Sequence, residues 1–161
     1  MLAIFPLIIS TAFASPNGSP RPAGSIGIGT CIGAPSGITG KVYLMDGLGA
    51  QFSFGGDLGR IGDIGFTLDG VFHLPSLNDG ADGYSIPLYM GAGVTASANI
   101  VEQAIPATFI GVRGVFGALV MVEGLPVELF IETAPTIYVL GSKQVPLTWG
   151  VDGQLGFRYY F

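Results

Sequence analysis

The sequence predicts an all-β protein, a closed antiparallel up-and-down transmembrane β-barrel of about eight strands. Its composition is the first reason, since 49% of the 161 residues are hydrophobic and only 11% are charged, whereas a soluble surface needs about 25–35% charge. Secondly, 27 glycines and 11 prolines are spread along the chain, and both residue types destabilise helices. Thirdly, apolar and polar residues alternate with the period of a strand. Because only helices and closed barrels satisfy their backbone hydrogen bonds inside hydrocarbon, we expect this β-rich chain to close into a barrel.

The first residues have the features of a segment that is removed from the mature protein. Residues 1–14 contain the apolar run Leu2–Ile9, which is too short to span a membrane, and the small-residue pattern Ala12-Phe13-Ala14. This arrangement predicts a cleavable signal peptide. Residues 15–24, with three prolines, are expected to form a flexible lead-in, and residues 25–161 the β-barrel. The alternative is a buried N-terminal strand or helix.

The clearest strand covers residues 147–161. Its two faces differ sharply in polarity, as expected when one face meets lipid and the other a polar interior. One face carries Leu147, Trp149, Val151, Leu155, Phe157, Tyr159 and Phe161. The other face carries Thr148, Gly150, Asp152, Gln154, Gly156, Arg158 and Tyr160.

The same alternation predicts seven further strands. They cover residues 26–33, 38–45, 48–54, 64–74, 86–95, 110–116 and 127–132. An even number of strands places the beginning and end of the barrel on one side. We expect connections 46–47, 75–83 and 123–126 on that side, and 34–37, 55–62, 99–107 and 141–146 on the other. Pro135 lacks a backbone N–H, so we expect a bulge or the rim of a strand there.

The inward-facing positions predict a polar network in the lumen. It comprises Lys41, Asp69, His73, Arg113, Glu128, Glu132, Asp152 and Arg158. Charges inside a barrel are costly without partners, so we expect ion pairs and hydrogen bonds among them. Side chains fill a barrel of about eight strands, so no open pore is expected. Inward glycines are expected to make room for Tyr43, Tyr89, Phe130 and Tyr138. The unpaired thiol of Cys31 would be tolerable in an oxidising compartment if it points into the lumen.

Few residues suggest catalysis or ligand binding. Asp69 and His73 could be an acid–base pair, but residues four apart on a strand lie about 13 Å apart, which favours a hydrogen-bonded lumen histidine. A net charge of −5 without a basic patch argues against nucleic acid. With one histidine and one cysteine, most metal sites are disfavoured, and neither a metal nor a cofactor is expected.

Five segments stand out together, at residues 37–41, 87–93, 111–114, 123–132 and 156–161. They resemble an uncharacterised family of predicted bacterial outer-membrane barrels, similar in architecture to the small OmpA/OmpX-type proteins. The resemblance spans nearly the whole mature chain. It implies a place in the outer membrane, contact with its lipid, and recognition by the barrel assembly machinery. Phe157, Tyr159 and Phe161 are similar to the aromatic signal by which such barrels are recognised for assembly. The resemblance transfers no catalytic residue.

We therefore expect a small integral outer-membrane barrel with a structural or surface-interaction role and no enzymatic activity. One alternative is an outer-membrane lipid-modifying enzyme, for which Ser76 or Ser85 would have to approach His73. Another is a soluble lipocalin-like barrel that binds an apolar ligand. The direction of the apolar face separates these classes, and Tyr84, Trp149 and Tyr159 at strand ends favour an outward apolar face.

Overall fold

The computed structural model describes residues 21, 24–78, 83–99, 108–140 and 147–161. These residues form nine β-strands: β1 (Ile26–Gly33), β2 (Ser36–Met45), β3 (Leu48–Asp57), β4 (Arg60–Ser76), β5 (Tyr84–Ser85), β6 (Pro87–Asn99), β7 (Thr108–Val122), β8 (Val127–Leu140) and β9 (Thr148–Tyr160). Within this part of the chain, no helix is long and apolar enough to cross a membrane. The predicted signal peptide, residues 1–14, and nearly all of the predicted lead-in lie outside the described residues.

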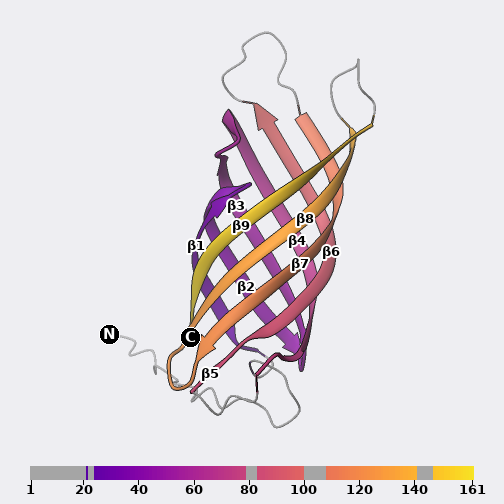
Figure 1. The fold of residues 1–161 in the computed structure, drawn as a ribbon. Coiled ribbons are helices and arrows are strands. Elements are labelled where there is room, and N and C mark those ends of the chain that lie inside the picture. Colours follow the sequence, from indigo (N-terminus) through magenta and orange to yellow (C-terminus); the bar gives the residue numbers. More distant parts are fainter. Residues whose placement is uncertain (1–20, 22–23, 79–82, 100–107, 141–146) are drawn as a thin grey trace, which may run out of the picture.

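The strands close into an eight-stranded antiparallel up-and-down barrel, as predicted (Figure 1). Each wall strand pairs with its neighbour in the chain, and β1 pairs with β9 to complete the circle. The two-residue strand β5 is not part of this circle, because it pairs only with the end of β7. Because the barrel is closed, the wall has no free edge strand, and the main-chain groups of each wall strand are bonded to neighbouring strands.

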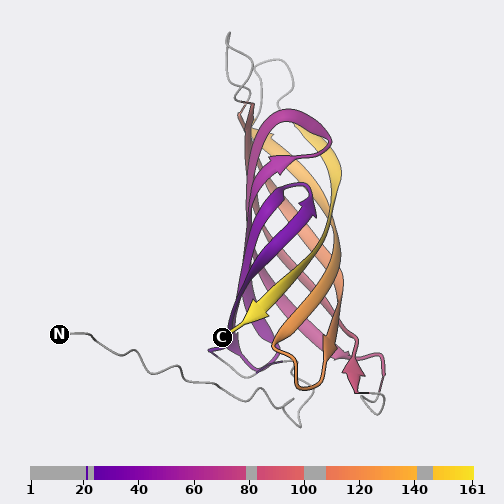
Figure 2. The same cartoon turned by 90° about the vertical axis from the view of Figure 1, so that its left-hand side faces the viewer.

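We call the two ends of the barrel the near end and the far end. The start of β1 and the end of β9 lie together at the near end, where Gly27 pairs with Tyr160. The β2–β3 turn, the connection that contains β5, and the β7–β8 turn are also at this end (Figure 1). The far end carries the β1–β2 and β3–β4 turns (Figure 2). Of the connections expected there, 141–146 and all of 99–107 except Asn99 lie outside the described residues.

Several strands extend beyond their predicted ends. The connection expected at residues 55–62 is wrong, because β3 continues to Asp57, β4 starts at Arg60, and only Leu58 and Gly59 form the turn. The predicted 34–37 turn is likewise shorter, since β2 begins at Ser36. Local glycine content suggests a loop, but pairing with a neighbouring strand outweighs that local preference.

Pro135 does not cause the predicted bulge. The β7–β8 register is the same on both sides of it, from Arg113 opposite Thr136 to Phe116 opposite Thr133. Pro135 faces outward, and its ring lies near Gly114, where an added Cβ would be 4.0 Å from Pro135 Cγ. A glycine opposite the ring leaves room for proline in the middle of the wall.

The two faces of the wall differ as the alternation predicted. Outward positions carry large apolar side chains on every wall strand, with Trp149 78% exposed. Inward positions carry polar, charged and aromatic side chains, together with a small apolar cluster around Val71, Val115 and Leu119. Cys31 is buried on the inward face.

Inward glycines lie opposite the lumen aromatic rings, and a Cβ added to any of them except Gly49 would meet the ring. Each ring stands directly across from a glycine on the neighbouring strand. The pairs are Tyr43 with Gly49, Tyr89 with Gly117, Phe130 with Gly156, Tyr138 with Gly111, and Tyr160 with Gly27. A Cβ on Gly27 would lie 2.7 Å from the Tyr160 ring. In the narrow lumen, large aromatic side chains therefore alternate with glycines.

Candidate functional site

The centre of the lumen is organised around the carboxylate of Glu128, which is fully buried. Its Oε1 lies 2.7 Å from Arg158 Nη1 and 3.5 Å from Lys41 Nζ. Its Oε2 accepts hydrogen bonds from Tyr160 at 2.8 Å and Tyr43 at 3.2 Å. These four partners come from β9 and β2 and compensate the desolvation of the carboxylate.

Arg158 is held from several sides. Its Nη2 donates to Thr39 Oγ1 at 3.0 Å and to Gln51 Oε1 at 3.4 Å. Its guanidinium carbon lies 3.9 Å from the centre of the Phe130 ring, within the range of a cation–π contact. A guanidinium bonded in this way has little freedom to leave the network.

A second carboxylate, Glu132, organises the other half of the lumen. It accepts hydrogen bonds from Tyr89 at 2.7 Å, Gln51 at 2.8 Å and Arg113 Nη2 at 2.9 Å. Arg113 Nε also lies 3.2 Å from Asp69 Oδ1. Gln51 joins the halves, because it donates to Glu132 and accepts from Arg158.

These six ionised side chains balance in charge. Three carboxylates face three cations, and all are buried. They are Asp69, Glu128 and Glu132 with Lys41, Arg113 and Arg158. The predicted ion pairing of these six residues is therefore confirmed. The Asp69 half is less completely bonded, because both carboxylate oxygens of Asp69 and the Nε and Nη1 of Arg113 have no hydrogen-bond partner among the described residues.

Asp152 and His73 face the lumen but make no ion pair within the described part of the chain. Asp152 is half-buried toward the far end and accepts hydrogen bonds from Thr136 at 2.9 Å and Tyr138 at 3.3 Å. Asp152 therefore stands apart from the central network into which it was predicted. The hydroxyl donors opposite it on β8 take the place of a cation.

His73 is a hydrogen-bonded lumen histidine, as the spacing on β4 favoured. Its Nδ1 lies 3.1 Å from the carbonyl oxygen of Gly47, and its Nε2 lies 3.4 Å from the Tyr43 hydroxyl. Its ring also packs beside those of Tyr43 and Tyr89. Ser76, one of the two serines considered for a lipid-modifying enzyme, bonds Asn78 and the backbone of Ile86 instead.

An arginine lies buried at the near end of the barrel. Arg21, which belongs to the predicted lead-in, is 3% exposed, and its guanidinium carbon lies 4.2 Å from the centre of the Tyr160 ring. Its Nη2 donates to the carbonyl oxygen of Val127 at 3.2 Å. At least this residue of the lead-in is therefore held against the barrel.

Sequence reasoning did not identify several network residues. Thr39, Gln51 and Gln154 are uncharged, and Arg21 precedes the barrel. Alternation sets Gln51 and Gln154 opposite the apolar faces of their strands, and the same rule that identified Lys41 gives the inward position of Thr39. For Arg21, no local signal was present, because its partners Tyr160 and Val127 are distant in sequence.

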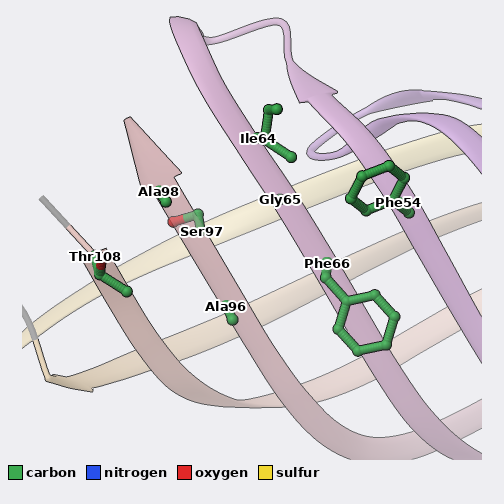
Figure 3. Close-up of a pocket in the computed structure, with 8 residues that line it drawn as sticks. All are labelled: Phe54, Ile64, Gly65, Phe66, Ala96, Ser97, Ala98 and Thr108. Atoms are coloured by element: carbon green, nitrogen blue, oxygen red, sulfur yellow. The ribbon is translucent and has the colours of Figure 1, made fainter. Parts of the chain in front are cut away.

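The outer surface carries one apolar hollow near the far end. Figure 3 shows the rings of Phe54 and Phe66 with Ile64 on β3 and β4, beside the small side chains of Ala96 and Ala98 on β6. Gly65, Ser97 and Thr108 complete its lining. The predicted assembly residues Phe157, Tyr159 and Phe161 also face outward, and the Tyr159 and Phe161 rings meet edge to face.

Among the described residues, no cluster of three or more His, Cys, Asp or Glu side chains could hold a metal ion. Comparison with known proteins finds no matching family model, curated protein or solved structure. The family resemblance therefore stays a prediction. The candidate functional features of the chain are its apolar outer face and the network of paired charges in its lumen.

Proposed function

We propose that this chain is a small integral protein of the bacterial outer membrane, with a structural or surface-interaction role and no open pore. One observation carries the proposal, namely that the outer face of the wall is apolar while the inner face is polar and charged. Large apolar side chains face outward on every wall strand, and ionised groups face inward. Lipid is the environment that stabilises this arrangement, because water outside would leave the apolar belt exposed.

The dimensions of the wall support the same proposal. The wall strands have between 8 and 17 residues, and a strand needs about 9–11 residues to cross a bilayer. Trp149 and Tyr159 project outward toward opposite ends of β9, as in the aromatic girdles of membrane barrels. The near end, which holds both ends of the wall, would face the periplasm.

The lumen supports a role without transport. A network of six ionised groups crosses the lumen, and Arg21 packs against Tyr160 at the near end. A lipocalin-like barrel would need an apolar cavity inside, whereas the interior here is lined mostly by bonded polar groups. This contrast favours the membrane proposal over a soluble ligand carrier.

Lipid and the barrel assembly machinery are the proposed partners. The outward row Phe157, Tyr159 and Phe161 supports an assembly role, since it presents aromatic rings along the end of β9. We expect Phe161→Ala to lower outer-membrane abundance in cells while leaving the unfolding midpoint of the refolded barrel nearly unchanged. Phe54→Ala, which removes an outward ring from another strand, is the matched control. Equal abundance of both variants would contradict the assembly role.

Fractionation of cells that express the full chain tests the membrane proposal. We expect the protein in the outer-membrane fraction, extracted only by detergent, with a β-rich circular dichroism spectrum. Its gel mobility should change on heating, because a folded barrel resists the detergent of the gel until heated. A detergent-free monodisperse monomer that binds apolar ligands would overturn the proposal in favour of the lipocalin-like alternative.

A further inference from the structure

The β1–β2 turn, residues Ala34 and Pro35, folds into the barrel. Pro35 is buried, and a Cβ built on Gly65 of β4 would lie 3.3 Å from Pro35 Cβ. Gly65 faces the lumen, since it lies on the same face of β4 as the buried residues Asp63 and Thr67, two positions away on either side. The proline ring thus reaches past β3 to the inner face of β4. Figure 2 shows the β1–β2 hairpin, in indigo, ending below the β3–β4 hairpin.

The backbone around the turn explains its inward course. Gly33 has φ +136°, a value that disfavours side chains, and it precedes the turn directly. Ser36 braces the turn, because its Oγ accepts from Gly33 N and donates to Gly33 O, both at 2.8 Å. Gly37, Gly55 and Gly65 are cross-strand neighbours, and together they leave the inner surface below the turn free of side chains.

Two inward side chains contact the carbonyl oxygen of Pro35. Gln154 Nε2 donates to it at 2.9 Å, and Cys31 Sγ lies 3.4 Å away. Gln154 is itself anchored to the wall, because its Oε1 accepts from Ser53 Oγ at 3.2 Å. One amide therefore connects the turn to β3 and β9, and its buried hydrogen bonds form away from competing water.

We propose that the β1–β2 turn is a plug that closes the far end of the lumen, and that the Gln154 amide is the latch that holds it. Cys31 lies under this plug and is covered by it. Release of the latch lets small solutes enter from the far end as far as the Cys31 thiol. The proposal rests on the barrel fold and stands whether or not the barrel lies in a membrane.

The reactivity of Cys31 measures the position of the plug. It is the only cysteine in the chain, so a small charged thiol reagent reports on this one site in the full-length folded protein in detergent. We expect slow modification in the unaltered protein. Gln154→Glu keeps an acceptor for Ser53 but loses the donor to Pro35, and it places a carboxylate against the Pro35 carbonyl. We expect modification to become about three- to tenfold faster. This factor is the increase in the population of molecules with an open plug that the loss of one buried hydrogen bond would cause.

Thr136→Val is the matched control. It also removes a far-end hydrogen bond, from Thr136 to Asp152, but it does not touch the plug. We expect its modification rate to equal that of the unaltered protein. If Thr136→Val accelerates modification as much as Gln154→Glu, the effect is general loosening and the latch is refuted. Equal rates in Gln154→Glu and the unaltered protein would refute it as well.

A second pair of variants tests the contact between Pro35 and the inner face of β4 independently of Gln154. Gly65→Val fills the space beside the Pro35 ring, whereas Gly70→Val adds the same side chain to the outer face of β4, where the nearest atom to a Cβ lies 3.9 Å away. We expect faster Cys31 modification only in Gly65→Val. The shift in gel mobility on heating identifies the folded fraction of each variant, and the modification rates of these folded fractions are compared. Rapid modification of the unaltered folded protein, at the rate of the unfolded chain, would overturn the plug altogether.

Discussion

Glu128 and Arg158 stand directly opposite each other on β8 and β9, and their 2.7 Å ion pair lies wholly inside the barrel. Lys41 and two tyrosines bond the same carboxylate. Glu128 therefore bonds four lumen side chains, two of them cations. Its replacement is the most direct test of the network.

We expect Glu128→Gln to destabilise the barrel by about 3–5 kcal/mol, because removing one partner leaves buried cations uncompensated. The free energy of unfolding in detergent, from denaturant titration, measures the effect. Glu123→Gln is the matched control, since Glu123 is exposed in the β7–β8 turn, and it is expected to change stability by less than about 0.5 kcal/mol. Similar losses in both variants would contradict the lumen network.

The glycines opposite the lumen rings are expected to tolerate no side chain. Gly117→Ala would place a methyl group 2.5 Å from Cε1 of Tyr89, and overpacking of this kind costs about 1–3 kcal/mol. Gly70→Ala, on the outer face, has no atom nearer than 3.9 Å to the added Cβ and is expected to be nearly neutral. In the double variant with Tyr89→Leu, the cost of Gly117→Ala should shrink. A loss that persists unchanged would mean that the ring is not the cause.

A charged residue introduced at an outward position is expected to destabilise the barrel more strongly the deeper that position lies in lipid. Leu155 lies mid-strand on β9 and faces outward, and arginine near the midplane of a bilayer costs about 2–4 kcal/mol. Leu58→Arg, in the exposed β3–β4 turn, is expected to cost about 0–1 kcal/mol. Unfolding measured in lipid vesicles gives the two values. If the two substitutions are equally tolerated, the outer face does not lie in lipid.

The filled lumen is expected to block ion flow. In planar bilayers, the full chain should give no stable conductance steps, because bonded side chains project into the barrel and Arg21 packs against Tyr160 at the near end. A porin inserted under the same conditions serves as the positive control. Regular steps from the purified protein would contradict a closed lumen.

Much of this barrel could be predicted from residues close together in the sequence. Alternation along a strand assigns each side chain to a face, because successive Cβ atoms point in opposite directions. That local rule correctly placed Lys41, Glu128 and Arg158 inside, and Trp149 outside. It also predicted room for Tyr89, since glycines are frequent at inward positions.

What the local rule could not supply is which inward residues meet. Glu128 and Lys41 are 87 positions apart, and their contact depends on the register of every strand pair and on the closure of β1 with β9. For the same reason Asp152, correctly assigned to the inner face, lies too far toward the far end to join the ion pairs.

The β1–β2 turn also shows which features follow from local sequence and which depend on the closed barrel. By itself the sequence determined that Ala34 and Pro35 lie in a turn between two strands, because proline and the flanking glycines interrupt the alternation. Only the tertiary structure decided that this turn points inward, because its contacts, Gln154 on β9 and Gly65 on β4, are brought beside it by closure of the wall. Local backbone preferences act over a few residues, whereas the space inside a barrel exists only once all of its strands are in register.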